Sequence, residues 1–199
     1  MLIKSKYKIA RRLNTPVFEK TQTPKFALRE GRRQKRNFAR SNYGIQLVEK
    51  QKVRFTYVLS AKQFANYVKK VLSKKVLNQQ EVLFGLLENR LDNVVYRAGF
   101  APTRLASRQM VSHGHIVING KKVNIPSYQV SVGEVISIRP GSQKAKLFST
   151  LDETLPKHKA PSWIKVDPEK KIVTVQGQPV LNQTELQFDL ALVLEFYSR

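Results

Sequence analysis

The fold of this 199-residue chain is decided by residues 88–120, which read ENRLDNVVYRAGFAPTRLASRQMVSHGHIVING. A first helix is predicted because apolar residues recur on one of its faces: Leu91, Val94 and Val95. Gly99 suits the position just beyond that helix, where a left-handed backbone is usual. Thr103 is a good N-cap for a second helix from Arg104 to about Ser112. The stretch therefore predicts two short helices joined by a tight turn.

The residues that follow predict β structure. Asn119-Gly120 between apolar residues is the strongest short signal for a hairpin, and residues 134–138 read as a closing strand. Residues at i, i+4 and i+8 give the second helix one cationic and polar face: Arg104, Arg108 and Ser112. The result is a compact αα-β module, and we expect its basic side chains to face outward: Arg97, Arg104, Arg108, Lys121 and Lys122.

The charge of the chain indicates a polyanionic partner. It has 36 Lys and Arg, 14 Asp and Glu, and a formal net charge of +22. Residues 1–57 carry 16 basic and 3 acidic side chains, a net +13, whereas residues 151–199 carry 6 and 7, a net −1. A basic segment before folded parts is typical of nucleic-acid binders. The absence of Cys excludes disulfides and thiolate metal sites, and the longest apolar run, 82–87, is far shorter than the ~20 residues of a membrane span.

Residues 1–45 are expected to form an extended basic arm. Pro16, Pro24 and Gly31 interrupt the pattern, although a short helix near Lys8–Leu13 is compatible with it. Such a segment buries too little apolar surface to offset its ordering entropy, so we expect it to order on a partner. A solvated tail or a localisation signal is the alternative. Aromatic side chains lie among the charges, a combination that suits stacked bases and phosphates: Tyr7, Phe18, Phe26, Phe38 and Tyr43.

Residues 46–89 are predicted to begin a helical domain that the end of the chain completes. One apolar stripe at helical spacing indicates core packing: Phe64, Tyr67, Val68, Val71 and Leu72. In residues 151–199, alternation over 163–175 predicts a hairpin, and Thr184-Glu185-Leu186-Gln187 fits a capping box for a final helix. That helix is apolar on several sides, so we expect this region to pack back on the helical domain. The fold class is then α+β, with residues 90–150 as an inserted module.

Four groups of motifs give the chain a family resemblance. Within residues 90–128, the stretches RLDNVVYR, RQMVSHGH, VINGK and PSY resemble the small RNA-binding module named after ribosomal protein S-four. Residues 43–54, YGIQLVEKQKVR, are similar to a signature of the same ribosomal family. Residues 8–12, KIARR, are similar to its amino-terminal basic motif, and residues 195–199, EFYSR, to its terminal motif. The whole chain thus resembles the bacterial or organellar type of the ribosomal protein S-four family.

The resemblance implies a structural protein of the small ribosomal subunit, with no cofactor and no membrane partner. The family binds small-subunit ribosomal RNA at a junction in its 5′ domain early in assembly. It also lies where messenger RNA enters the subunit, beside the fifth and third small-subunit proteins, and affects unwinding and decoding accuracy. The residues expected to contact RNA are Arg11, Arg12, Arg32, Arg33, Lys35, Arg36, Arg40, Lys50, Lys52, Arg54, Arg97, Arg104, Arg108, Ser112, His113, Lys121 and Lys122. Among these, the resemblance places Lys35, Arg36 and Arg40 nearest the messenger.

The chain departs from the family pattern at three points. The family's usual Pro-Gly-Gln-His-Gly turn is absent, and a basic stretch from Arg29 to Arg40 takes its place. Many members have cysteines in the arm, some of which bind zinc or an iron–sulfur cluster, and this chain has none. The helix after Thr103 has Ala106 where the family has a Glu that would complete a capping box. The expected location is a ribosome, in the bacterial cytoplasm or in an organelle.

Two other classes of protein use the same module. An RNA-modifying enzyme needs a catalytic domain of well over 100 residues, and the sequence outside the module leaves no room for one. A ribosome-rescue binder is compact and lacks the long arm and the terminal motif. His113 and His115 lack a third metal ligand nearby, and no phosphate-binding glycine loop is present. We therefore expect no catalytic activity and no metal site, and we expect Asp92 to make a structural ion pair or hydrogen bond.

Overall fold

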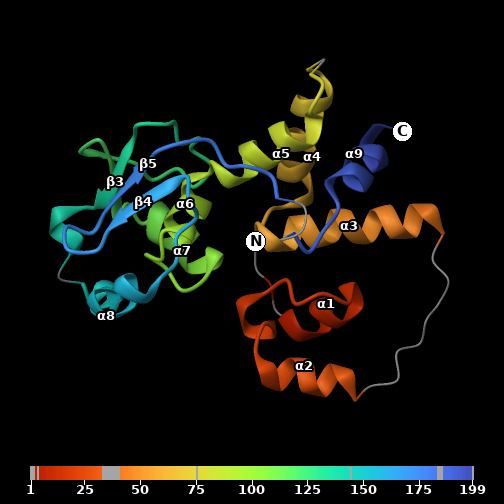
Figure 1. The fold of residues 1–199 in the computed structure, drawn as a ribbon, viewed down its shortest axis with the longest axis horizontal. Helices are drawn as coiled ribbons and strands as arrows, with labels where there is room; N and C mark the ends of the chain where they lie inside the picture. Colours follow the sequence, from red (N-terminus) through yellow and green to blue (C-terminus); the bar gives the residue numbers. More distant parts are fainter. Residues whose placement is uncertain are drawn as a thin grey trace. The chain divides into compact units, whose positions relative to one another are not determined.

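The computed structural model describes residue 3 and residues 5–32, 41–74, 76–143, 145–182 and 186–198. The chain divides into two compact units, one of residues 1–83 with 182–199 and one of residues 84–181. Figure 1 shows the elements of both units. The helices of the first unit are α1 Lys6–Leu13, α2 Pro24–Gly31, α3 Asn42–Thr56, α4 Ala61–Leu72 and α9 Leu190–Ser198, with a 3-10 turn at Glu19–Thr21. Helix α5, Gln79–Glu88, runs across the boundary between the units.

The second unit combines short helices with a sheet. Its helices are α6 Leu91–Arg97, α7 Arg104–Ser112 and α8 Leu151–Thr154, with 3-10 turns at Pro140–Ser142, Lys146–Phe148 and Leu155–Lys157. Its strands are β1 Ile116–Ile118, β2 Lys121–Lys122, β3 Val135–Ile138, β4 Ile164–Asp167 and β5 Ile172–Val175. The mixture of helices and sheet confirms the predicted α+β fold class.

The C-terminal helix completes the helical unit, as predicted. Helix α9 contacts α3 and α4, and all three lie side by side in Figure 1. Tyr197 packs edge-on against Phe64 of the apolar stripe, with ring centroids 6.1 Å apart. Val193 of α9 and Val68 of α4 are fully buried. An apolar helix is stable only when its apolar surface is buried. Helix α9 therefore forms one core with α3 and α4, which are distant from it in the sequence.

The final helix begins later than the predicted capping box. The prediction is therefore wrong for the two capping-box residues that the structure describes. Leu186 and Gln187 are not helical, and Thr184 and Glu185 lie outside the described residues. The N-cap is Asp189, whose Oδ1 accepts the backbone N–H groups of Ala191 and Leu192 at 2.7 and 3.3 Å. The backbone N–H of Asp189 donates to Glu49 Oε2 at 2.9 Å. A buried carboxylate on α3 thus fixes where α9 starts, which local sequence does not reveal.

The expectation of an extended arm is wrong for residues 5–32. This segment forms α1, a 3-10 turn and α2, and α3 already begins at Asn42. Its apolar residues are few, but they form a small core together with residues of α3: Leu13, Val17, Phe18, Val48 and Phe55. The rings of Phe18 and Phe55 meet edge-on at 6.0 Å. Helix α1 confirms the short helix near Lys8–Leu13.

The sheet of the second unit has the order β2-β1-β3-β5-β4, and every neighbouring pair is antiparallel. The predicted hairpin of residues 163–175 is present as β4 and β5. Its expected position on the helical domain is wrong, because β5 pairs with β3 through Ile136 opposite Val173. Both residues belong to one buried core with Leu91, Met110 and Trp163. The hairpin therefore extends the sheet of the αα-β module.

Local signals in the module are confirmed. Gly99 has a φ of +83° just after α6, where a left-handed residue ends a helix. The Thr103 hydroxyl accepts the backbone N–H of Ala106 at 3.1 Å and caps α7. Asn119 and Gly120 have φ values of 48° and 77° in the β1–β2 turn, which both residues tolerate well.

Candidate nucleic-acid interface

Glu88 organises the first part of the candidate interface. Its side chain, only 1% exposed, accepts hydrogen bonds of 2.9 and 2.8 Å from Nε and Nη2 of Arg97. Its Oε2 also accepts from Asn93 Nδ2 at 2.9 Å. Asn93 Oδ1 in turn accepts from Arg104 Nε at 2.8 Å, and the Arg104 guanidinium lies 4.4 Å from the centre of the Tyr96 ring. One buried carboxylate therefore orients two arginines from two helices.

Asp92 organises the second part. It accepts from Nε and Nη2 of Arg90 at 3.0 and 2.8 Å, and this arginine is fully buried. It also accepts from Nε of Arg108 at 3.0 Å, and Nη2 of Arg108 lies 2.9 Å from the same carboxylate. The Ser107 hydroxyl donates to the backbone carbonyl of Asp92. The expected structural ion pair of Asp92 is confirmed.

We name these groups the arginine cluster: Arg90, Arg97, Arg104 and Arg108 with Glu88 and Asp92. Four guanidinium groups against two carboxylates leave an excess of two positive charges. The expectation that three of these arginines simply face outward is wrong in part, because Arg97, Arg104 and Arg108 are half-buried and bound to neighbours. Two buried acidic groups hold them, since a buried carboxylate requires paired donors. Three guanidinium groups of the cluster are thus held in place at partly exposed positions, whereas Arg90 is buried.

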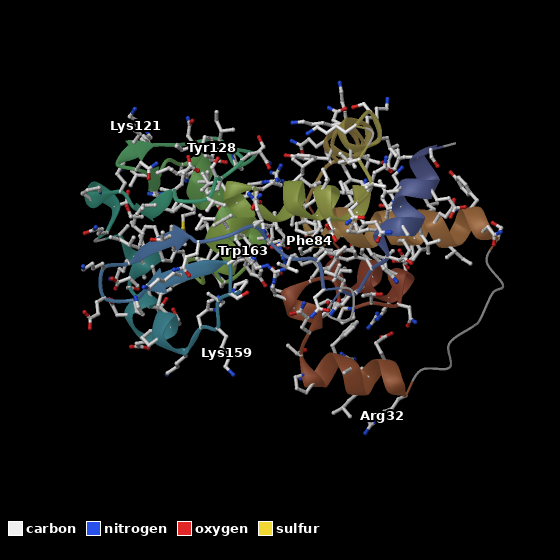
Figure 2. The ribbon with its side chains drawn as sticks, turned by 45° about the horizontal axis from the view of Figure 1, so that its top comes forward. Arg32, Phe84, Lys121, Tyr128, Lys159 and Trp163 are labelled. Atoms are coloured by element: carbon white, nitrogen blue, oxygen red, sulfur yellow. The ribbon has the colours of Figure 1, made fainter. Side chains whose placement is uncertain are left out.

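The β1–β2 hairpin carries further predicted residues. Lys121 and Lys122 form β2 and are exposed, and Figure 2 shows Lys121 at the outer edge of the unit. The Lys122 side chain lies over Gly114, where a Cβ would collide with it. The sequence-predicted residues at the end of α7 therefore lie near this hairpin. These residues are Ser112 and His113, and both are exposed. The Ser112 hydroxyl donates to the Arg108 carbonyl at 2.8 Å.

A second cationic site lies in the helical unit, which we name the α3–α9 cluster: Lys50, Arg54, Phe196 and Tyr197. Lys50 Nζ lies 4.3 and 4.7 Å from the two ring centres of α9. Burial lowers the pKa of Lys50, and the charge of Arg54 one helical turn away lowers it further. Arg54 Nε and Tyr197 Oη are buried and have no hydrogen-bond partner in the described part of the chain. Lys50 and Arg54 thus place two like charges one helical turn apart on α3.

The other predicted residues have different surroundings. Lys52 Nζ is 2.6 Å from Glu49 Oε1, and Arg11 Nε is 2.9 Å from Glu30 Oε1. Arg12 is exposed on α1, and Arg32 lies at the end of α2, as Figure 2 shows. Four further predicted residues lie outside the described residues: Arg33, Lys35, Arg36 and Arg40.

Sequence reasoning did not single out several residues that shape the site. Glu88 and Asn93 orient arginines of the cluster, and Tyr96 lies against one of them. Phe196 and Tyr197 hold Lys50 across a gap of nearly 150 residues in the sequence. The spacing of Glu88 and Arg97 matches no helical contact distance, so only the turn between α5 and α6 brings them together.

The described residues contain no group of three or more His, Asp and Glu side chains that could hold a metal ion. Within the same residues, none of the helices has the length and apolar character needed to cross a membrane.

Comparison with known proteins decides the family. The profile described as "Ribosomal protein S4/S9 N-terminal domain" matches residues 1–88, and the profile described as "S4 domain" matches residues 89–136. Small ribosomal subunit protein uS4 of Chlorobium phaeovibrioides is 45% identical over 159 residues, which cover 80% of this chain and 78% of that protein. The chain belongs to the uS4 family. The uS4 protein of Roseiflexus castenholzii is 46% identical over 161 residues, covering 80% and 78%, and that of Syntrophomonas wolfei is 45% identical over 170 residues, covering 85% and 79%.

Family membership confirms the resemblance seen in the sequence motifs. The two uS4 profile matches meet at the arginine cluster, because Glu88 is the last residue of the first match and Arg97 lies in the second. The cluster therefore joins side chains from the two matched segments.

Proposed function

We propose that this uS4-family chain is a structural constituent of the small ribosomal subunit and binds small-subunit ribosomal RNA. The observation that carries the proposal is the arginine cluster, in which Glu88 and Asp92 hold several guanidinium groups in place. Guanidinium groups match phosphate geometry with pairs of donors. A surface held in place before binding loses less side-chain entropy on binding than a flexible one.

The binding mechanism is displacement of counterions from RNA by a fixed array of cations. Each phosphate neutralised releases counterions, which makes the affinity depend steeply on salt. Specificity comes from RNA shape, because double-stranded RNA offers side chains phosphates and 2′-hydroxyls more readily than base edges. The α3–α9 cluster and the β1–β2 hairpin add contacts on the same principle: Lys50, Arg54, Lys121 and Lys122.

The finer assignments are part of the same proposal. The RNA target is a junction in the 5′ domain, and binding there nucleates assembly. The chain also lies where messenger RNA enters the subunit, beside the fifth and third small-subunit proteins, and acts without catalysis on a bacterial or organellar ribosome. The residues proposed to contact RNA are those expected from the sequence, and three of them belong to the arginine cluster: Arg97, Arg104 and Arg108.

Filter binding to the 5′ domain of small-subunit RNA tests the proposal, with an unstructured RNA of equal charge as competitor and with salt varied. We expect tight binding that resists the competitor. The double variant Arg104→Ala plus Arg108→Ala should weaken binding and flatten the salt slope by roughly 0.7–0.9 per lost phosphate contact. The matched control is Lys159→Ala plus Lys165→Ala, two exposed cations of the same unit outside the proposed set. The proposal is contradicted if the competitor RNA abolishes binding to the 5′ domain. It is also contradicted if the two double variants have equal salt slopes.

A further inference from the structure

The first unit also contains a groove whose lining residues belong to neither cationic cluster. A groove with a volume of about 580 Å³ lies between α1 and α2. This volume falls in the range of sites that hold small ligands. Five of its nine lining residues are Lys or Arg, and none is acidic. The chain thus offers a concave cationic site, and Arg11 is its only lining residue in the RNA-contact set derived from the sequence.

Two aromatic rings lie in the wall of this α1–α2 groove. The rings of Tyr7 and Phe26 are 5.7 Å apart and inclined by 36°, one from each helix. Tyr7 is 48% exposed. A tyrosine that is half exposed keeps part of its ring available for a flat ligand. Base stacking on such rings contributes to binding of every base, because each base has a π-face.

Four of the five cations of the groove are not neutralised within the described chain. Lys6, Lys8, Lys25 and Arg29 line it, and none of them has a carboxylate partner among the described residues. Arg11 is held differently, since its Nε is 2.9 Å from Glu30 Oε1 and its guanidinium lies near the Phe26 ring. The groove therefore has an aromatic wall and a surplus of positive charge at its edges.

We infer that the α1–α2 groove binds an unpaired nucleotide of RNA, with the base stacked on Tyr7 and Phe26 and the phosphates held by Lys8, Lys25 and Arg29. The rings suit a base, the cations suit phosphates, and the volume suits a nucleotide rather than a duplex, whose bases are stacked internally. This inference rests on the proposed function and names the kind of RNA element that the first unit recognises.

Photo-cross-linking tests the inference with the full chain and a single-stranded hexanucleotide that contains 4-thiouridine. We expect cross-linked peptides from 5–8 and 23–29. Tyr7→Leu should lower this cross-link yield about five-fold or more, since a stacked base is lost. Tyr7→Phe keeps the ring and should retain the yield. Phe26→Leu gives a second test, and circular dichroism verifies that the helices of each variant are intact.

The outcomes separate this inference from the proposed function. Equal yields for Tyr7→Leu and Tyr7→Phe, or equal labelling of the groove by double-stranded RNA, overturn the nucleotide site. Competition by an acidic peptide as effective as that by the oligonucleotide also overturns it, because the groove is then a general anion site. Filter binding of the 5′ domain is measured on the same preparations. Retained 5′-domain binding with no groove cross-link leaves the proposed function standing, whereas loss of competitor-resistant binding by the unaltered chain refutes that function.

Discussion

Glu88 and Arg97 are joined by two hydrogen bonds of 2.9 and 2.8 Å, although Glu88 ends α5 and Arg97 ends α6. The carboxylate is buried while the guanidinium is 33% exposed. The pair thus fixes an arginine at the surface from a point inside the unit. Because Asn93 bonds to the same carboxylate, the position of Arg104 depends on it as well.

Replacing the Glu88 carboxylate by an amide tests this dependence. Glu88→Gln removes the charge and places a donor where Arg97 and Asn93 donate. We expect the free energy of unfolding to fall by about 1–3 kcal/mol and 5′-domain RNA binding to weaken. Urea denaturation measures the first effect. The control is Glu81→Gln, an exposed residue of the same helix, which should change stability by no more than about 0.5 kcal/mol.

Asp92 provides a comparison between buried and exposed ion pairs. Asp92→Asn leaves Arg90 buried with a weakened counter-charge, so we expect a loss of about 3–5 kcal/mol. Asp152 pairs with Lys171 at 2.8 Å, but its side chain is 68% exposed. Asp152→Asn should therefore cost only about 0–1 kcal/mol, and less at high salt. Similar losses for both variants would show that burial does not decide the strength of these pairs.

Signals within a few residues predicted much of the second unit. Gly99, Thr103 and Asn119-Gly120 act through their own backbone preferences, and the structure confirms each of them. The position of the 163–175 hairpin was missed because pairing of Ile136 with Val173 joins strands far apart in the sequence. Alternation shows that a strand has one apolar face, but it does not show which sheet edge receives it.

The sequence predicted which cationic residues belong to the candidate site better than it predicted how they are arranged. Sequence motifs pointed to Arg97, Arg104 and Arg108, but not to the carboxylates that hold them. Ion pairs between helices depend on how the turn between those helices places their ends. The packing of residues 5–32 was missed for a similar reason, because Phe18 gains its burial from Phe55 on α3 rather than from its own segment.

The cap of α7 offers a stabilising change. The Thr103 hydroxyl already accepts one backbone N–H. Position 106 holds Ala, whose side chain cannot accept the backbone N–H of Thr103 in return. Ala106→Glu should complete the capping box and add a favourable charge near the helix N-terminus, raising stability by a few tenths to about 1 kcal/mol. Thr103→Ala should lower stability by about 1 kcal/mol. Thermal denaturation of both variants measures the effects, and a loss in Ala106→Glu would show that the added side chain does not fit the partly buried position.

His115 predicts a pH dependence of stability. Burial lowers its pKa, and the charges of His113 and Arg139 lower it further. Its Nδ1 lies 3.0 Å from the Ser142 hydroxyl. The unfolded chain therefore binds a proton more readily than the folded one, so this contribution to stability is present above about pH 6.5 and is lost as the pH falls below that value.

Denaturation between pH 7.5 and 5.5 checks the effect of His115. His115→Asn keeps a polar partner for Ser142 but removes the titrating group, so we expect a weaker loss of stability on acidification than in the unaltered chain. His113→Asn should reduce the loss only in part, because burial is the largest cause of the shift. Equal pH dependence in the unaltered chain and His115→Asn contradicts the assignment.

Arg54 is expected to strengthen binding to RNA and to lower the free energy of unfolding of the chain. Its Nε is buried without a hydrogen-bond partner in the described chain, and burial lowers its pKa. A buried donor left unpaired costs about 1–3 kcal/mol, whereas its contact with the Phe55 ring at 4.5 Å is worth about 0.5–1 kcal/mol. Arg54→Met keeps the apolar stem, so we expect stability to rise by about 0.5–1 kcal/mol while 5′-domain RNA binding weakens and its salt slope falls by roughly 0.7–0.9.

Lys62→Met, an exposed position on α4, is the control and should leave the salt slope unchanged. A drop in stability together with an unchanged salt slope would make Arg54 a packing residue of α3 and remove it from the RNA-binding surface.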